Sequence, residues 1–233
     1  MDVSKFRKEI PWISWASAVL AAYALKRFYS RASAEDLSWI LAPTARIVGW
    51  LRGETLVPGL TGWVAPDGSY VIAPACAGVN FLIVAFAVSV LGFSHRLVSP
   101  GRRICWWIGS LIGAWALTVA VNTSRILAAV ELYRMGPVAG LTPEAAHRLL
   151  GIGVYLGALW GLFAGLDRLT GGRSGLGAAL LVSGLYLGMT VVTPLLNGAF
   201  RQPGYAGHAM MVSLVTLIWT GALALGFRKR EKT

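Results

Sequence analysis

The chain contains 233 residues, of which 56% are hydrophobic and only 13% are charged, and its formal net charge is +11. Soluble globular domains carry about 25% charged residues, so this composition leaves too few polar groups to cover a water-facing surface. Two cysteines are too few for a disulfide framework. The Lys and Arg residues are not interleaved with aromatic residues, as a nucleic-acid-binding surface requires. We therefore expect an all-α polytopic membrane protein with no nucleic-acid partner, rather than a disordered chain or a disulfide scaffold.

The N-terminal part of the chain holds two apolar segments of different character. Residues 10–25 follow three basic residues, and no small-residue cleavage site follows them closely. This favours a membrane anchor leaving the cytoplasm over a signal peptide. Residues 37–51 are shorter and are interrupted by Pro43 and Arg46. A full span there would reverse the side of the next connection, so we predict an interfacial or re-entrant segment.

Two short strands are expected after this segment. Residues 62–65 and 69–72 contain Trp, Tyr, Val and Ile, and a Pro-Asp-Gly turn at 66–68 separates them. Such a pattern favours a β-hairpin. We expect a small extracytoplasmic hairpin before Cys76.

Five longer uncharged stretches have about 18 residues or more, which is the length that crosses a bilayer as a helix. They cover residues 68–94, 104–124, 149–166, 174–200 and 209–227. Together with the N-terminal anchor they predict about six transmembrane helices in a single integral membrane domain of residues 1–233.

Basic residues cluster in alternate connections between these stretches. Residues 94–103, residues 167–175 and the C-terminal tail together hold nine Lys and Arg. Cytoplasmic connections of membrane proteins are enriched in such residues, so these three are expected in the cytoplasm together with both termini. The protein is expected in the cell membrane, in contact with its lipids, and its other connections are expected outside.

This topology brings three reactive side chains to the outer face from three different helices. Cys76 stands at the outer start of one helix, and His147 opens another. A helix beginning at Ile104 rises about 1.5 Å per residue, so Arg125 lies roughly 31 Å higher, about one hydrocarbon thickness. The sequence therefore predicts a candidate site of Cys76, Arg125 and His147.

These residue types suit acyl transfer through a thioester. A thiolate at Cys76 would be the nucleophile and His147 would carry protons. Arg125 would hold a developing oxyanion. Asn122 shares a helical face with Arg125 and could orient it or bind substrate, and Gly78 would let backbone amides come close to a reacting group. Neither a metal nor a cofactor is expected.

Each residue also has a structural interpretation. Cys76 could be a packing residue, Arg125 could extend to the lipid headgroups, and His147 could be an ordinary helix-end residue. We expect Cys105 to be a packing residue and His95, on the cytoplasmic side, to be structural or exposed. His208 enters a helix from outside and rivals His147, although solvation at a loop end is its simpler interpretation.

The segments around these residues resemble the motifs of one family. Pro74-Ala75-Cys76-Ala77-Gly78-Val79, followed by an apolar helix, resembles the cysteine motif of the exosortase/archaeosortase family. Asn122-Thr123-Ser124-Arg125-Ile126 is similar to its Asn-x-x-Arg motif, and His147 with Gly151 resembles its third element. Order, spacing and membrane placement agree over an exosortase-like core of about residues 57–166.

The resemblance implies a polytopic membrane cysteine transpeptidase, in which Cys76 is the nucleophile, Arg125 stabilises the transition state and His147 carries the proton. Its substrates would be membrane-anchored proteins with a C-terminal signal made of a short motif such as Pro-Glu-Pro, a transmembrane helix and a basic cluster. A lipid or cell-surface polymer would be a possible acceptor. Ala77 departs from the Ser that is common in the family, and no appended soluble domain is expected.

Two other classes of function fit the composition. In a small transporter, Arg125 and His147 would line a polar path, although no convincing inverted repeat supports this. In a non-catalytic assembly subunit, Cys76 would be dispensable.

Overall fold

The computed structural model describes residues 3–137, 140–172 and 175–230, and the side chains of residues 12–137, 140–172 and 175–227. Part of the charge-based topology depends on basic side chains outside the described ones: Lys5, Arg7, Lys8, Arg173, Arg228, Lys229, Arg230 and Lys232.

The described chain is mostly helical. Its α-helices are α1 (Val3–Tyr29), α2 (Ser38–Arg52), α3 (Val79–Phe93), α4 (Pro100–Met135), α5 (Pro143–Leu169), α6 (Leu176–Leu187), α7 (Thr193–Leu196) and α8 (Tyr205–Arg230). A π-helical segment, Gly188–Val192, joins α6 to α7, and short 3-10 turns lie at Pro74–Cys76, Ser94–Arg96 and Ala199–Arg201. The strands are β1 (Val57–Gly59), β2 (Gly62–Val64) and β3 (Val71–Ile72).

Five helical segments are long and apolar enough to cross a membrane, which supports a multi-pass membrane protein. They are Pro74–Arg96, Pro100–Met135, Pro143–Leu169, Leu176–Leu196 and Tyr205–Phe227. The described part of α1 is not among them, so the total of six spans stays a prediction.

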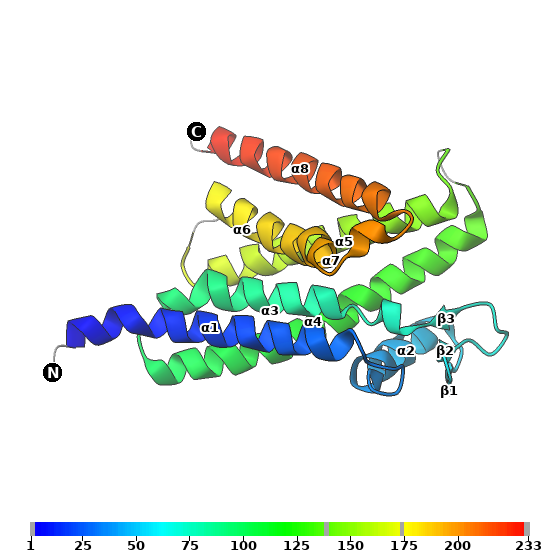
Figure 1. The fold of residues 1–233 in the computed structure, drawn as a ribbon, viewed down its shortest axis with the longest axis horizontal. Coiled ribbons are helices and arrows are strands. Elements are labelled where there is room, and N and C mark those ends of the chain that lie inside the picture. Colours follow the sequence, from blue (N-terminus) through cyan, green and yellow to red (C-terminus); the bar gives the residue numbers. More distant parts are fainter. Residues whose placement is uncertain (1–2, 138–139, 173–174, 231–233) are drawn as a thin grey trace.

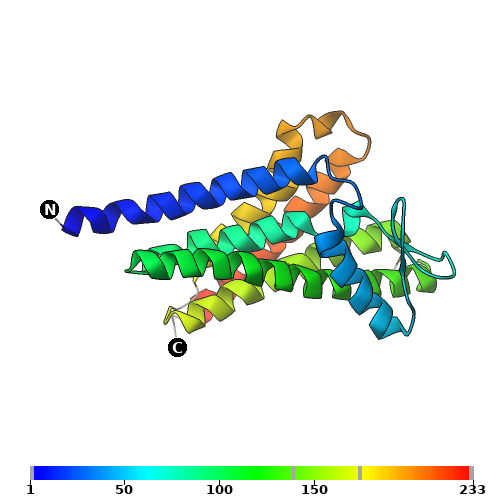
Figure 2. The same cartoon turned by 90° about the horizontal axis from the view of Figure 1, so that it is seen from below.

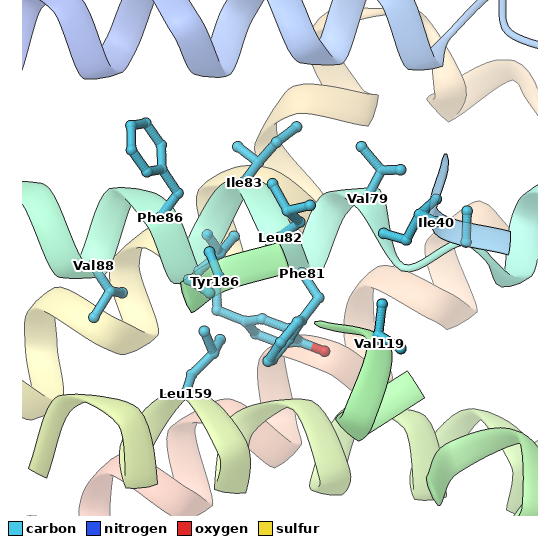
Figure 3. Close-up of a cluster of buried hydrophobic side chains, with 14 of the residues drawn as sticks. Ile40, Val79, Phe81, Leu82, Ile83, Phe86, Val88, Val119, Leu159 and Tyr186 are labelled. Atoms are coloured by element: carbon cyan, nitrogen blue, oxygen red, sulfur yellow. The ribbon is translucent and has the colours of Figure 1, made fainter. Parts of the chain in front are cut away.

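Helix α3 lies at the centre of the bundle. Its apolar window is 78% buried inside the protein, against 11–22% for the other four candidate spans. It packs against α1, α4, α5 and α6, and its side chains leave it in several directions, with Phe86 and Val88 on opposite sides (Figure 3). A helix that is apolar all round is expected to be buried all round. The polar Ser89 on α3 donates its hydroxyl to Ala85 O at 2.8 Å.

Helix α2 and the strands cap one end of the bundle (Figure 2). The 15 residues of α2 give a helix of about 22 Å, which is shorter than the hydrocarbon core of about 30 Å. β1, β2 and β3 form an antiparallel sheet in that order, with Trp63 opposite Ile72. The expected hairpin is therefore present as β2 and β3, and β1 adds a third strand to it.

Helix α4 corrects the expected end of its segment. The sequence interpretation ended the span at residue 124, but the helix has 36 residues and continues to Met135. Residues 126–135 contain Leu, Ala, Glu and Arg, which favour helix, and they contain no Gly or Pro before Gly136. Arg125 therefore lies within α4, with a further ten residues of helix beyond it.

Helix α5 also starts earlier than expected. It begins at Pro143, and the Thr142 hydroxyl accepts a hydrogen bond from Ala145 N at 3.3 Å. A threonine cap followed by proline is a typical helix start. His147 thus lies in the second turn of α5 rather than at its opening.

The start of α1 and the end of α8 lie at the end of the bundle opposite the sheet. α1 begins and α8 ends at the same end of the bundle, away from α2 and the strands (Figure 1). At that end, Arg96 Nη1 lies 2.8 Å from the buried Asp167 Oδ1 and links the turn after α3 to the end of α5.

Candidate active site

Cys76 ends the 3-10 turn that connects β3 to α3. Its thiol is free and the residue is half-buried. Pro74 occupies the first position of the turn, and Cys76 N donates to Ala73 O at 2.7 Å. Tyr29 OH, at the end of α1, donates to Pro74 O at 3.5 Å. The turn that carries the thiol is therefore fixed by a hydrogen bond within it and by a second one from α1.

Gly78 allows this turn to approach α4 closely. Its φ of +70° lies in the left-handed region, which favours glycine. A Cβ at this position would lie 3.1 Å from Thr118 Cγ2, 3.3 Å from Asn122 Cγ and 3.4 Å from Tyr155 OH. Any larger residue would push the turn away from α4 and α5.

The side-chain amide of Asn122 joins the residues of the site. Asn122 is fully buried. Its Nδ2 donates to Cys76 O, and its Oδ1 accepts from Arg125 Nε at 3.1 Å and from Tyr155 OH at 3.0 Å. One amide thus fixes the main chain at Cys76, the direction of Arg125 and the register of α5 against α4.

Arg125 is buried among the helices rather than extended to the surface. It is 9% exposed, and its Cζ lies 5.5 Å from the centre of the Tyr155 ring. In the described part of the chain, no carboxylate forms an ion pair with it. Its positive charge is therefore free to hold an anion or an oxygen that is becoming one.

Arg125 and His147 line the same pocket, of about 220 Å³. Arg148 and His208 line it as well, and none of its lining residues is acidic. His147 Nδ1 is buried without a hydrogen-bond partner, and its ring centre lies 5.9 Å from that of Tyr133. The pocket is consequently lined by basic residues, one of which, His147, has a ring nitrogen without a hydrogen-bond partner among the described residues.

The expected residues gather as two adjoining pairs. Asn122 links Cys76 to Arg125, and the pocket links Arg125 to His147. Between the described side chains of Cys76 and His147 there is no hydrogen bond, and Cys76 is not among the residues that line the pocket. Arg125 is therefore the residue common to both pairs.

Sequence reasoning missed the tyrosine that completes the site. Tyr155 packs its ring on Phe81, with centres 4.8 Å apart, and bonds to Asn122. It stands eight residues after His147, with Gly151 midway, and this spacing places all three on one face of α5. This spacing could have identified Tyr155 as a candidate site residue from the sequence.

Helix α1 also reaches the site. Lys26 Nζ donates to Asn80 Oδ1 at 2.8 Å, and Asn80 lines the pocket. This contact joins the end of α1 to the first turn of α3, next to Cys76.

Cys105 and His95 lie away from the site. Cys105 is exposed near the start of α4, where it lines a separate groove of about 670 Å³. His95 lies in the 3-10 turn after α3. Both positions are at the opposite end of the bundle from Cys76.

A charged network holds the sheet against α4. Arg52 Nε lies 2.6 Å from Glu54 Oε1, Arg52 Nη1 lies 3.1 Å from Glu131 Oε1, and Tyr70 OH donates to Glu54 Oε1. The hydrogen bond from Tyr70, together with Arg52, lowers the pKa of Glu54 below its usual value. Burial and the bond to Glu54 raise the pKa of Tyr70 to about 12. The network keeps the sheet beside the turn that carries Cys76.

Comparison with family models, curated proteins and solved structures returned no match for this chain. Among the described residues, no group of three or more His, Cys, Asp and Glu is placed to hold a metal ion. The site offers a thiol, imidazoles, guanidinium groups and a tyrosine hydroxyl.

Proposed function

We propose that this protein is a membrane-embedded cysteine transpeptidase of the exosortase/archaeosortase type. The observation that carries the proposal is the Asn122 amide, which binds both the main chain at Cys76 and the guanidinium of Arg125. A cysteine linked through one amide to a buried arginine without a carboxylate partner among the described residues supplies the two groups that thioester formation needs first, a nucleophile and a stabiliser for the oxyanion.

In the first step, the Cys76 thiolate attacks the carbonyl carbon of the scissile amide. The carbon–sulfur bond forms, the carbonyl oxygen takes the negative charge, and Arg125 stabilises it. Because Asn122 occupies Arg125 Nε, the terminal nitrogens of the guanidinium serve the substrate. The amide carbon–nitrogen bond then breaks, and protonated His147 supplies the proton that the leaving amine requires.

In the second step, an acceptor nucleophile attacks the thioester. Neutral His147 takes the proton of the acceptor amine or hydroxyl, the new acyl bond forms, and the Cys76 thiolate is released. The acceptor is a lipid or a cell-surface polymer, and water in its place would give hydrolysis. No oxidant, reductant or metal enters this balance.

The proposed setting is the outer face of the cell membrane. We assign α1 as a sixth span, α2 as an interfacial or re-entrant helix under the sheet, and both termini to the cytoplasm. The substrates are membrane-anchored proteins that end in a short motif, a transmembrane helix and a basic cluster. Such a substrate would place its cleavage point at the level of Cys76, next to the sheet.

The test is cleavage of a membrane-anchored reporter that ends in a Pro-Glu-Pro motif, an apolar helix and a basic tail, co-expressed with the full chain. Cys76→Ala is expected to abolish cleavage, because loss of a covalent nucleophile costs several orders of magnitude in rate. Cys105→Ala is the matched control and should cleave like the wild type. The acyl adduct on Cys76 should be detected by mass spectrometry and should disappear on treatment with hydroxylamine.

Arg125→Lys gives an independent test, because a lysine keeps the charge but not the planar set of donors. We expect it to lose most of the cleavage. Undiminished cleavage by Cys76→Ala would contradict the enzymatic proposal and favour a non-catalytic assembly subunit. Undiminished cleavage by Arg125→Lys would restrict the role of Arg125 to its charge.

A further inference from the structure

A third cavity, distinct from the pocket beside Arg125 and from the groove beside Cys105, lies far from the candidate active site, between α1 and the start of α4. This groove of about 470 Å³ is lined on α1 by Ile13, Ser14 and Ser17, and on α4 by residues that include Arg103 and Trp107. α1 is held beside the turn before α4, since Trp15 Nε1 donates to Ser94 Oγ at 3.0 Å. The groove is at the end of the bundle opposite the sheet.

Two of the residues that line this groove each carry a buried hydrogen-bond donor without a protein partner among the described residues. Arg103 is only 6% exposed, and its Nε donates to Leu97 O at 2.7 Å, but its Nη1 is buried and unpaired. Trp107 Nε1 is also buried and unpaired. The two residues are four apart on α4 and therefore share a face of the helix. In the described part of the chain, no carboxylate forms an ion pair with Arg103.

Unpaired donors inside an apolar surrounding are costly. A buried polar group without a partner loses its hydration and gains nothing in return, and a charged group loses most. Proteins therefore leave few such groups, and those that remain call for a ligand or water. A guanidinium and an indole N–H on one face are donors that suit a phosphate anion.

The rest of the groove suits an acyl chain. Ile13, Ile104 and Ile108 line it and are 69%, 62% and 50% exposed, which leaves an apolar strip along α1 and α4 beside Arg103 and Trp107. Ser99 at the start of α4 accepts a hydrogen bond from Arg102 N at 3.2 Å. The positive end of the α4 dipole therefore adds to the attraction for an anion at this level.

We propose that this groove binds an anionic phospholipid, with its phosphate on Arg103 and Trp107 and one acyl chain along the isoleucines. This assignment does not depend on the proposed peptidase activity. A zwitterionic lipid would offer the same chain, but its headgroup carries no net charge to match the unpaired Arg103.

The test measures lipid binding to the full chain, purified in detergent and stripped of lipid. Native mass spectrometry counts bound phosphatidylglycerol and phosphatidylcholine during titration, and a thermal-unfolding series compares both lipids with sodium phosphate. We expect tighter binding of phosphatidylglycerol by the wild type. Arg103→Gln should weaken that binding roughly tenfold or more, because a charge-assisted bond is lost. Trp107→Phe, which keeps the ring but removes the N–H, should weaken it several-fold.

Arg102→Gln is the matched control, because it removes the same charge from the exposed neighbouring residue. Its binding should stay within about twofold of the wild type, as expected for a screened surface charge. Equal binding of the two lipids, or equal loss in Arg102→Gln and Arg103→Gln, would overturn the proposal. Stabilisation by sodium phosphate equal to that by phosphatidylglycerol would show a simple anion site and also overturn it. If Arg103→Gln does not fold, unchanged binding by Trp107→Phe decides against the site.

Discussion

Replacing Asn122 by leucine removes the amide that joins the candidate site while keeping a side chain of similar size. The change leaves Cys76 O, Arg125 Nε and Tyr155 OH without their partner, inside a region where Asn122 itself is fully buried. Each group left unpaired costs about 1–3 kcal/mol. Neighbouring side chains relax in part, so we expect a total loss of roughly 3–6 kcal/mol, a large share of the stability of an ordinary domain.

The loss can be measured as a change in melting temperature. For chains of this length, about 1 kcal/mol corresponds to roughly 2–4 °C, so Asn122→Leu should melt roughly 6–24 °C below the wild type. The assay is thermal unfolding in one detergent, followed by tryptophan fluorescence. Asn197→Leu is the control, because Asn197 is exposed after α7 and forms its hydrogen bonds through its main-chain nitrogen, which leucine keeps. A melting temperature for Asn122→Leu within about 2 °C of this control would refute the reasoning.

A companion variant separates the three bonds. Tyr155→Phe removes only the bond from Tyr155 OH and should cost about one third of the Asn122→Leu effect. In the double variant the two losses should not add, because residues in one hydrogen-bond network are coupled. Simple addition would show that the Tyr155 hydroxyl contributes independently of its bond to Asn122.

Three further outcomes are expected. Gly172→Ala should lower the melting temperature by several degrees, because a Cβ there would overlap the carboxylate of Asp167 and displace its ion pair with Arg96. Gly175→Ala is the control, because it has open space around it, whereas Gly171 has a positive φ that alanine would strain. The pKa of Glu54 is lowered in the folded protein, so its stabilisation of the sheet should be complete above pH 4.5 and be lost as the pH falls further. Hydrogen exchange in the strands should become faster over that fall in pH, and Glu54→Gln should remove this pH dependence. His147→Ala should abolish reporter cleavage while His208→Ala reduces it modestly, and the reverse order would exchange their roles.

The transmembrane segments could be predicted because a span depends on local composition. Whether a run of residues is apolar and long enough to cross a membrane can be judged from those residues alone. Each of the five candidate spans overlaps one of the five uncharged stretches, although their ends differ. The hairpin before Cys76 was predictable for the same reason, since its turn residues and its β-formers are adjacent in the chain. The strand β1 carries Pro and Gly, which disfavour a strand, so its pairing depends on the neighbouring β2.

The end of α4 was not predictable from the charges that follow Arg125. The uncharged stretch ends at residue 124, but the charged residues that follow, such as Glu131 and Arg134, do not end a helix, whereas Gly136 does. The charges are accommodated because Glu131 pairs with Arg52 and Arg134.

The sequence analysis placed the site at one end of the bundle, but it could not supply the rotation of each helix about its own axis. The contact of Asn122 with Tyr155 spans 33 residues and depends on how α4 packs on α5. The same unknown rotation explains why the sequence did not reveal that Arg125 joins Cys76 to His147. Helix periodicity sets which residues share a face, but only packing decides which face meets which neighbour.

The continuity of α4 gives the protein a sensitivity to the thickness of its bilayer. Its 36 residues make a rod of about 54 Å, nearly twice the hydrocarbon thickness. A thinner bilayer is matched by tilting such a rod, and the tilt moves Glu131 at its far end together with the sheet that Arg52 ties to it. The same rotation shifts Arg103 near its other end, about 33 Å from Arg125 along the axis. Hydrophobic mismatch would therefore act on both ends of the molecule at once.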